Sequence, residues 1–165
     1  MYSLNVPVPG RVERLASDLL PRLSPFERVR ERHTLVAKRF EESNLDRLRE
    51  RLRGPLAGQP AFEARVTGVD YFDLPARGAG PVVYLAVESP GLGALHERLV
   101  DAFGAVEGIE GPEYVPHVTL ARGGSLSDAE RLAGLDVERV TWTVSRLALW
   151  SAEYREAVET IALPA

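Results

Sequence analysis

The alternation of hydrophobic and polar residues predicts short strands and amphipathic helices in a regular order along the first half of the chain. A half-buried strand carries an apolar residue at every second position, and a helix packed on one face carries one at every third or fourth. Proline, glycine and asparagine mark where such segments begin and end. The expected elements are a strand at 2–8, a helix at 12–19, a strand at 32–40, a helix from Asn44 to Gly54-Pro55, and a strand at 62–72.

The second half of the chain repeats this order. The expected elements are a strand at 81–88, a helix from Pro90-Gly91 to Phe103, a strand at 116–123, a short helix opened by the capping box 127–130, and a long strand region at 139–150. The pairs Pro9-Gly10 and Pro90-Gly91 lie 81 residues apart, and His33 and His117 lie 84 apart. Each histidine therefore occupies nearly the same place in its own copy of a β-α-β-α-β unit.

Two such units predict an α+β fold that is bilobal and duplicated, with pseudo-twofold symmetry. The sheets would line a central groove and the helices would cover their outer faces, because each element must bury its apolar side against another. We expect a single domain over residues 1–165, with lobe-forming repeats at about 1–75 and 80–155. In that arrangement His33 and His117 would face each other across the groove.

Composition narrows the chemistry. The chain has 165 residues, 45% of them hydrophobic, which suffices for one compact domain. It has no cysteine and three histidines, so we expect no thiolate metal site, no metal and no cofactor. No apolar run approaches a membrane span, and the start lacks the pattern of a signal peptide, so we expect a cytoplasmic monomer. A net charge of −4 argues against broad nucleic-acid binding, although a local basic cluster can still hold one phosphate.

The histidines are the candidate catalytic residues. A single histidine in an apolar strand is more often a partly buried structural residue, but the repeated position favours a common role for His33 and His117. His96 lies beside the leucine stripe of a helix and has no counterpart in the first copy, so we expect it at the solvated edge.

Two facing imidazoles suit displacement at phosphorus. One ring can deprotonate the attacking oxygen while the other protonates the leaving oxygen, without a metal. Thr119 stands two residues after His117 and shares its strand face, where its hydroxyl can donate to a phosphate oxygen. His-x-Thr would then be a compact acid–base and oxyanion unit.

The segment Pro116–Arg122, PHVTLAR, resembles the second motif of the two-histidine (2H) phosphoesterase superfamily, in particular its 2′-5′ RNA ligase-like proteins that act as RNA 2′,3′-cyclic phosphodiesterases. The family pattern is two His-x-Ser/Thr motifs in a bilobal duplicated α/β fold, and the order of elements matches over the whole chain. The resemblance implies that His33 and His117 form the catalytic pair and that Thr119 binds the phosphate.

The first motif departs from that pattern, because Thr34 follows His33 directly. Either a bulge turns Thr34 toward the site, which would match Thr34-Leu35 with Thr119-Leu120, or this lobe contributes only an imidazole and Arg39 from the same strand face. Lys38 and Arg122 each stand five residues after a histidine and are either phosphate ligands or solvated charges. By simple alternation both would point away from the histidines. Six aromatic residues are candidates for stacking on a base, although strand aromatics are more often core: Tyr2, Tyr71, Tyr84, Trp142, Trp150 and Tyr154.

The sequence thus predicts a phosphoesterase that opens the 2′,3′-cyclic phosphate of an RNA end or a small cyclic nucleotide. The same acid–base pair could also use an RNA 5′-hydroxyl in place of water as the nucleophile, and that reaction would be 2′-5′ RNA ligation. Two alternatives stay open: a phosphodiesterase for 2′-5′ oligonucleotides, and a non-catalytic module that binds nucleotides or RNA ends on the same scaffold.

Overall fold

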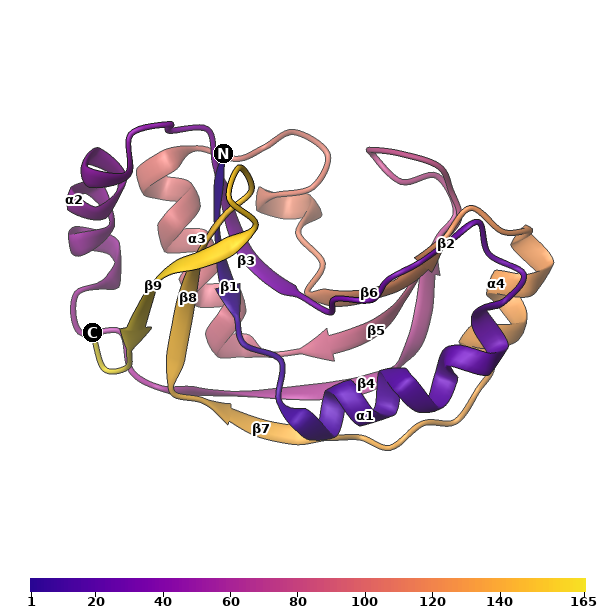
Figure 1. The fold of residues 1–165 in the computed structure, drawn as a ribbon. Helices are drawn as coiled ribbons and strands as arrows, with labels where there is room; N and C mark the ends of the chain where they lie inside the picture. The colour runs from indigo at the N-terminus through magenta and orange to yellow at the C-terminus, as the bar shows by residue number, and fades with distance from the viewer.

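The structure, a computed structural model, describes residues 1–165 as two antiparallel sheets with helices on their outer faces (Figure 1). Their order along the chain is β1 (Tyr2–Val6), α1 (Gly10–Leu19), η1 (Leu20–Leu23), β2 (Arg28–Val29), β3 (Leu35–Phe40), α2 (Leu45–Leu56), β4 (Phe62–Phe72), β5 (Val82–Glu88), α3 (Pro90–Phe103), η2 (Gly111–Glu113), β6 (His117–Arg122), α4 (Leu126–Ala133), β7 (Thr141–Val144), β8 (Arg146–Ser151) and β9 (Glu156–Ala162). The expected α+β fold with two sheets is confirmed.

The two halves of the chain exchange strands. One sheet has the order β3-β1-β8-β9, and the other has the order β2-β6-β5-β4-β7. Strand β8 comes from the second half but pairs with β1 of the first, while β4 comes from the first half but pairs with β5 of the second. Each sheet therefore contains strands from both halves, so a cut between residues 75 and 80 does not separate the sheets.

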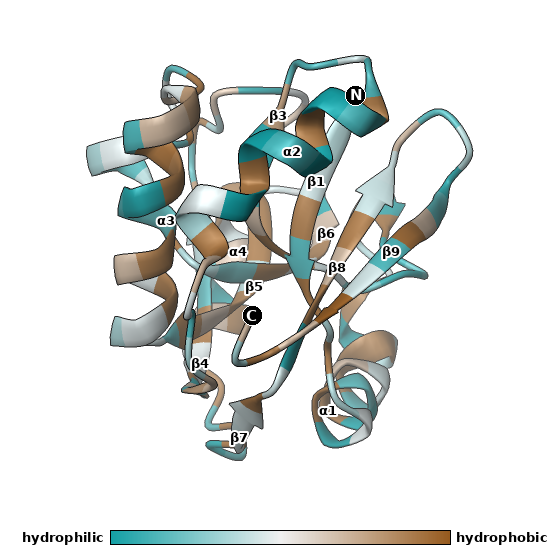
Figure 2. Cartoon of the chain, turned by 90° about the vertical axis from the view of Figure 1, so that its left-hand side faces the viewer, coloured by the Kyte–Doolittle hydropathy of each residue, from teal (hydrophilic) through white to brown (hydrophobic).

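The helices form where local signals and apolar stripes agree. The Asn44 side chain accepts a hydrogen bond from Arg47 N, as expected of a helix cap, and α2 buries Leu48, Leu52 and Leu56 along one side. Hydrophilic and hydrophobic bands alternate along this helix in Figure 2. The helix runs through Gly54-Pro55 instead of ending there.

Other boundaries also differ from the sequence prediction. The cap of α4 is Ser125, whose hydroxyl accepts from Asp128 N, so the capping segment begins two residues before the expected Ser127. The long strand region at 139–150 is two strands, β7 and β8, which belong to different sheets. The sequence pattern predicts neither the short β2 nor the final β9.

One continuous core joins both sheets to the helices. It contains 35 buried residues, including Leu4 of β1, Leu35 of β3 and Leu120 of β6. Helix α3 packs against β3 of one sheet and β4 of the other, so it ties the two sheets together. None of the helices has the length and apolar character needed to cross a membrane.

Candidate functional site

Two adjoining cavities form a groove on the face of the sheets that the helices leave open. The larger, of about 1150 Å³, is cavity 1, and the smaller, of about 220 Å³, is cavity 2. They share Arg30, Val36, Arg39 and Arg122, so they are parts of one depression, which we call the groove. Cavity 1 is further lined by Ser3, Asn5, Glu27, Arg28, Val29, Glu31, Arg32, Thr34, Trp150, Ala152 and Arg155. Cavity 2 is further lined by Phe72, Leu74, Pro75, Ala76, Arg77, Val82, Gly108, Ile109, Tyr114, Val115, His117 and Thr119.

Strand β6 presents His117, Thr119 and Arg122 to cavity 2. The first two share a face by simple alternation, as the sequence predicted. Arg122 joins them because Thr119 pairs with Tyr84 and Ala121 with Val83, which leaves Leu120 as an extra residue in the strand. This bulge shifts the side-chain alternation by one position, so the expectation that Arg122 points away from His117 is wrong.

The His117 ring is held in one orientation. Its Nδ1 lies 2.6 Å from the carbonyl oxygen of Val115, which can only accept, so Nδ1 carries a proton. The rings of Phe72 and Tyr84 stand edge-on to the imidazole at centroid distances of 5.3 and 5.2 Å. In the neutral ring the lone pair is therefore on Nε2, the nitrogen that a substrate proton can reach.

Burial and neighbouring charge keep this imidazole neutral. Burial is the largest influence and lowers the pKa of His117 below its ordinary value. The hydrogen bond to Val115 opposes that shift, while the positive charges of Arg39, Arg30 and Arg122 add to it. The ring thus has the charge state of a general base at neutral pH.

Strand β3 contributes Val36 and Arg39 to the groove, and the residue just before it contributes Thr34. Here too a bulge changes the alternation, because Asn5 pairs with Val36 and Leu4 with Lys38, which leaves Ala37 as the extra residue. Thr34 stands just before the strand and reaches cavity 1 without a bulge beside it. Arg39 reaches the groove because of the bulge at Ala37, and shares its face with Thr34.

His33 does not line either cavity. Its Nδ1 lies 2.7 Å from Oε2 of Glu13 on α1, and its side chain is nearly buried there. The next residue, Thr34, lines cavity 1, and Leu35 after it is buried in the core. The expectation that His33 faces His117 across the groove therefore disagrees with the structure.

Arg32 stands in the groove where the sequence suggested a histidine. It lines cavity 1 two residues before Thr34, as His117 lines cavity 2 two residues before Thr119. Both pairs are separated by 85 residues, Arg32 from His117 and Thr34 from Thr119. A comparison centred on the threonines instead of the histidines would have indicated this.

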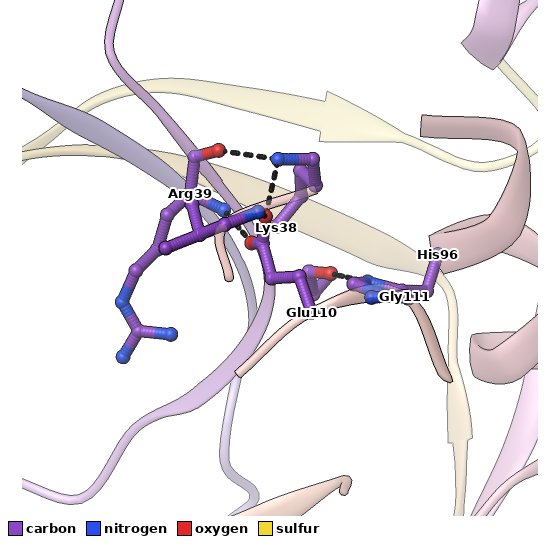
Figure 3. Close-up of polar contacts among 7 residues, drawn as sticks. Lys38, Arg39, His96, Glu110 and Gly111 are labelled. Atoms are coloured by element: carbon purple, nitrogen blue, oxygen red, sulfur yellow. Dashed lines mark hydrogen bonds and ion pairs between the residues drawn. The ribbon is translucent and has the colours of Figure 1, made fainter. Parts of the chain in front are cut away.

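Lys38 is part of the core and not of the groove. Its Nζ donates to Glu110 Oε1 at 2.6 Å and to the Arg39 carbonyl oxygen at 2.7 Å, and its side chain is 2% exposed (Figure 3). Glu110 Oε2 accepts from Arg39 N at 2.8 Å, and Oε1 accepts from Val106 N. Lys38 therefore neither binds phosphate nor faces solvent, contrary to both sequence expectations, since the bulge places it beside Ala37 on the inner face.

His96 on α3 also holds the loop that contains Glu110. It is buried, so the expectation that it lies at the solvated edge is wrong. Its Nε2 accepts from Gly111 N at 3.0 Å, so the proton is on Nδ1, which donates to the Ala37 carbonyl oxygen at 2.7 Å. The ring stacks on Tyr114 at 3.7 Å, and Tyr114 lines cavity 2. The loop from 104 to 116 is thus anchored to β3 through Glu110 and to α3 through His96 (Figure 3), which positions one wall of the groove.

The groove is strongly cationic although the chain as a whole is acidic. Seven arginines line it, against two glutamates, both in cavity 1: Arg28, Arg30, Arg32, Arg39, Arg77, Arg122 and Arg155 against Glu27 and Glu31. Burial lowers the pKa of Arg39 and Arg122, and other arginines lower them further, although Glu110 opposes the shift at Arg39. Arg122 Nη1 donates to the Arg77 carbonyl oxygen at 3.0 Å, and its buried Nε has no hydrogen-bond partner.

Comparisons with known proteins identify the family of the chain. The family model described as 2'-5' RNA ligase superfamily matches residues 9–156. The chain therefore belongs to the 2′-5′ RNA ligase superfamily, and its resemblance to the 2H phosphoesterases is confirmed. No curated protein sequence matches the chain.

Solved structures share the fold at low sequence identity. The protein TT0787 of Thermus thermophilus has a TM-score of 0.70 and 20% identity, over 99% of this chain and 98% of that one. E. coli LigT complexed with 3'-AMP has a TM-score of 0.64 and 13% identity, over 98% and 97%. A protein described as a phosphoesterase has a TM-score of 0.65 and 17% identity, over 98% and 97%. These similarities show that the fold extends over the whole chain.

Proposed function

We propose that this protein is a phosphoesterase that hydrolyses a 2′,3′-cyclic phosphate, at an RNA end or on a small nucleotide, without a metal ion. The observation that carries the proposal is the unit His117-x-Thr119 beside Arg122, in a groove lined by seven arginines. A base, a hydroxyl donor and fixed cations are the groups that displacement at a phosphate monoanion requires.

Each group has a definite role in this proposal. Nε2 of His117 takes a proton from the attacking water, while Nδ1 stays bonded to the Val115 carbonyl oxygen and keeps the ring oriented. Thr119 donates its hydroxyl to a nonbridging oxygen of the phosphate. Arg39 and Arg122 hold the negative charge that grows on these oxygens as water attacks.

The cationic lining of the groove and the ligands bound by proteins of the same fold support a nucleotide as the ligand. E. coli LigT, which shares the fold, has been crystallised with 3'-AMP, phosphate, ATP and NADP+. The described chain has no group of three or more His, Cys, Asp or Glu suited to hold a metal ion, and cations already line the groove. Arginine can supply the charge stabilisation that a metal ion supplies elsewhere.

A second candidate is a module that binds nucleotides or RNA ends without turnover. The observation that favours it is the position of His33 outside the groove, which leaves one imidazole where a symmetric acid–base pair needs two. 2′-5′ ligation would use the same groups as hydrolysis, with an RNA 5′-hydroxyl in place of water as the nucleophile.

The test is the hydrolysis of 2′,3′-cyclic CMP in EDTA, with His117→Gln and His33→Gln as a matched pair of variants. We expect turnover in the wild type, a loss of about 10²-fold or more in His117→Gln, and near wild-type rates in His33→Gln. Binding of 3′-CMP, measured by calorimetry in parallel, separates the two candidates. Binding without any turnover would favour the module, and turnover lost in EDTA but restored by a divalent metal would contradict the metal-free mechanism.

A further inference from the structure

Two chain segments, at the start of β3 and in β6, contribute a similar set of residues to the groove. In the second half of the chain the groove-facing residues are His117, Thr119 and, after a bulge, Arg122. In the first half, Arg32 and Thr34 have the same spacing, and Arg39 follows after the bulge in β3. The threonines correspond, and an arginine follows each of them after a bulge, five residues after Thr34 and three after Thr119. At the position two residues before the threonine, the first half has a guanidinium and the second half has an imidazole.

The side chain of Arg32 is positioned rather than free. Its guanidinium lies over the face of Trp150 on β8, 4.3 Å from the ring centroid. Both residues line cavity 1 beside Thr34, and none of the ion pairs of the chain engages Arg32 with a carboxylate. A guanidinium stacked on an aromatic ring still presents its N–H groups at its edge, where they can donate to a phosphate.

We propose that Arg32 takes the place of a second acid–base group and acts as a fixed cation on the leaving oxygen of the cyclic phosphate. This inference rests on the proposed function. A guanidinium in a protein stays protonated, so it stabilises negative charge but does not exchange a proton during turnover. The site would then have one titrating catalytic group, His117, and one permanent cation, Arg32.

The step balances with water as the only co-reactant. A bond forms between the water oxygen and phosphorus as the bond from phosphorus to one ribose oxygen breaks. The water proton goes to Nε2 of His117, and the leaving oxygen keeps the electron pair under the N–H groups of Arg32. That oxygen then takes a proton from solvent, and the imidazolium returns one proton to solvent.

This asymmetry favours hydrolysis of the cyclic phosphate over its formation. In the direction that forms the cyclic phosphate, the ribose hydroxyl beside Arg32 must lose a proton as it attacks phosphorus, and a guanidinium cannot accept that proton. It also predicts the pH profile of kcat/KM, which should rise through one ionisation and then stay level, instead of forming the bell expected of two imidazoles in opposite protonation states.

The experiment is the pH profile of 2′,3′-cyclic CMP hydrolysis in the wild type, Arg32→Ala, Arg32→Lys and Arg32→His. We expect a single rising limb in the wild type, a loss of about 10²-fold or more in Arg32→Ala, and a smaller loss in Arg32→Lys. In Arg32→His a second ionisable group restores a bell-shaped profile. Arg28→His, a change of the same type elsewhere in cavity 1, should keep a single limb.

Two outcomes overturn the inference: a bell-shaped profile in the wild type, or kcat/KM of Arg32→Ala within about twofold of wild type. Binding of 3′-CMP separates this inference from the proposed function. If the wild type has no turnover, the proposed function fails. A loss of 3′-CMP affinity of about tenfold or more in Arg32→Ala then still supports Arg32 as the phosphate cation, and unchanged affinity overturns that role as well.

Discussion

The contacts of the buried ion pair between Lys38 and Glu110 determine how much stability the protein should lose when the pair is broken. Lys38→Met removes the cation and leaves a carboxylate whose side chain is 2% exposed. Glu110 keeps its hydrogen bonds from the backbone N–H groups of Arg39 and Val106 but loses the charge-assisted bond of 2.6 Å. The variant therefore contains a buried negative charge with no opposite charge beside it.

Breaking a buried pair in this way costs about 3–5 kcal/mol, more than a hydrogen bond alone, because the remaining ion stays desolvated. Glu110→Gln should cost a similar amount, since it strands the Lys38 ammonium. The double variant Lys38→Met with Glu110→Gln removes both charges, so it should recover part of the loss. The sum of the single losses should exceed the double loss by more than about 1 kcal/mol.

Urea unfolding of the four proteins, followed by circular dichroism, gives the free energies for this cycle. A native domain is stable by about 5–15 kcal/mol, so a single variant loses a measurable share without necessarily unfolding. If Lys38→Met lost less than about 1 kcal/mol, or if the single losses simply added, Lys38 and Glu110 would not be coupled in solution.

The same pair links stability to pH. Burial alone would raise the pKa of Glu110, but hydrogen bonds from Lys38, Arg39 N and Val106 N outweigh it and hold that pKa below its ordinary value. Because the folded pKa is lower than the unfolded one, of about 4.3, the stabilisation is present above that pH and is lost as pH falls through the folded pKa. The stability difference between wild type and Glu110→Gln should therefore shrink on acidification below about pH 4.3.

The remaining predictions concern the groove and its wall. Because burial and then Arg39 lower the pKa of His117, kcat/KM should rise with pH through a value below 6.5, and Arg39→Gln should move that limb to higher pH. Thr119→Val and Thr34→Val should each lower kcat by about 10²–10³-fold with unchanged thermal unfolding, and normal kinetics in either would remove that hydroxyl from the site. His96→Phe strands two buried backbone groups and should cost about 2–4 kcal/mol in urea unfolding; a cost below about 1 kcal/mol would contradict its two hydrogen bonds.

Features that depend on local signals could be predicted from the sequence. The bounds of β4 match the apolar run 62–72, and Asn44 caps α2 because its side chain reaches a donor three residues away. The exchange of β4 and β8 between the sheets could not be predicted, because strand pairing depends on contacts between segments far apart in the chain. For the same reason the two-residue β2 has no signal of its own beyond its partner β6.

The candidate site was predictable where the strand is regular. His117 and Thr119 share a face by alternation, and the structure places both in the groove. The prediction that His33 pairs with His117 was wrong, because the residue that corresponds to His117 in the first half is Arg32, one position before His33. The dipeptides Thr34-Leu35 and Thr119-Leu120 carry the correct register, since both threonines line the groove and both leucines are buried.

The two bulges explain why the cations of the groove could not be assigned by counting residues. Simple alternation from Thr119 would turn Arg122 into the core, and the extra Leu120 turns it back to the groove. In β3 the extra Ala37 places Arg39 in the groove and leaves Lys38 inside, where only Glu110 makes its charge tolerable. A bulge adds no signal to the hydrophobic pattern, because it lies within an apolar run. The chemistry of the groove therefore depends on two inserted residues that never contact the substrate.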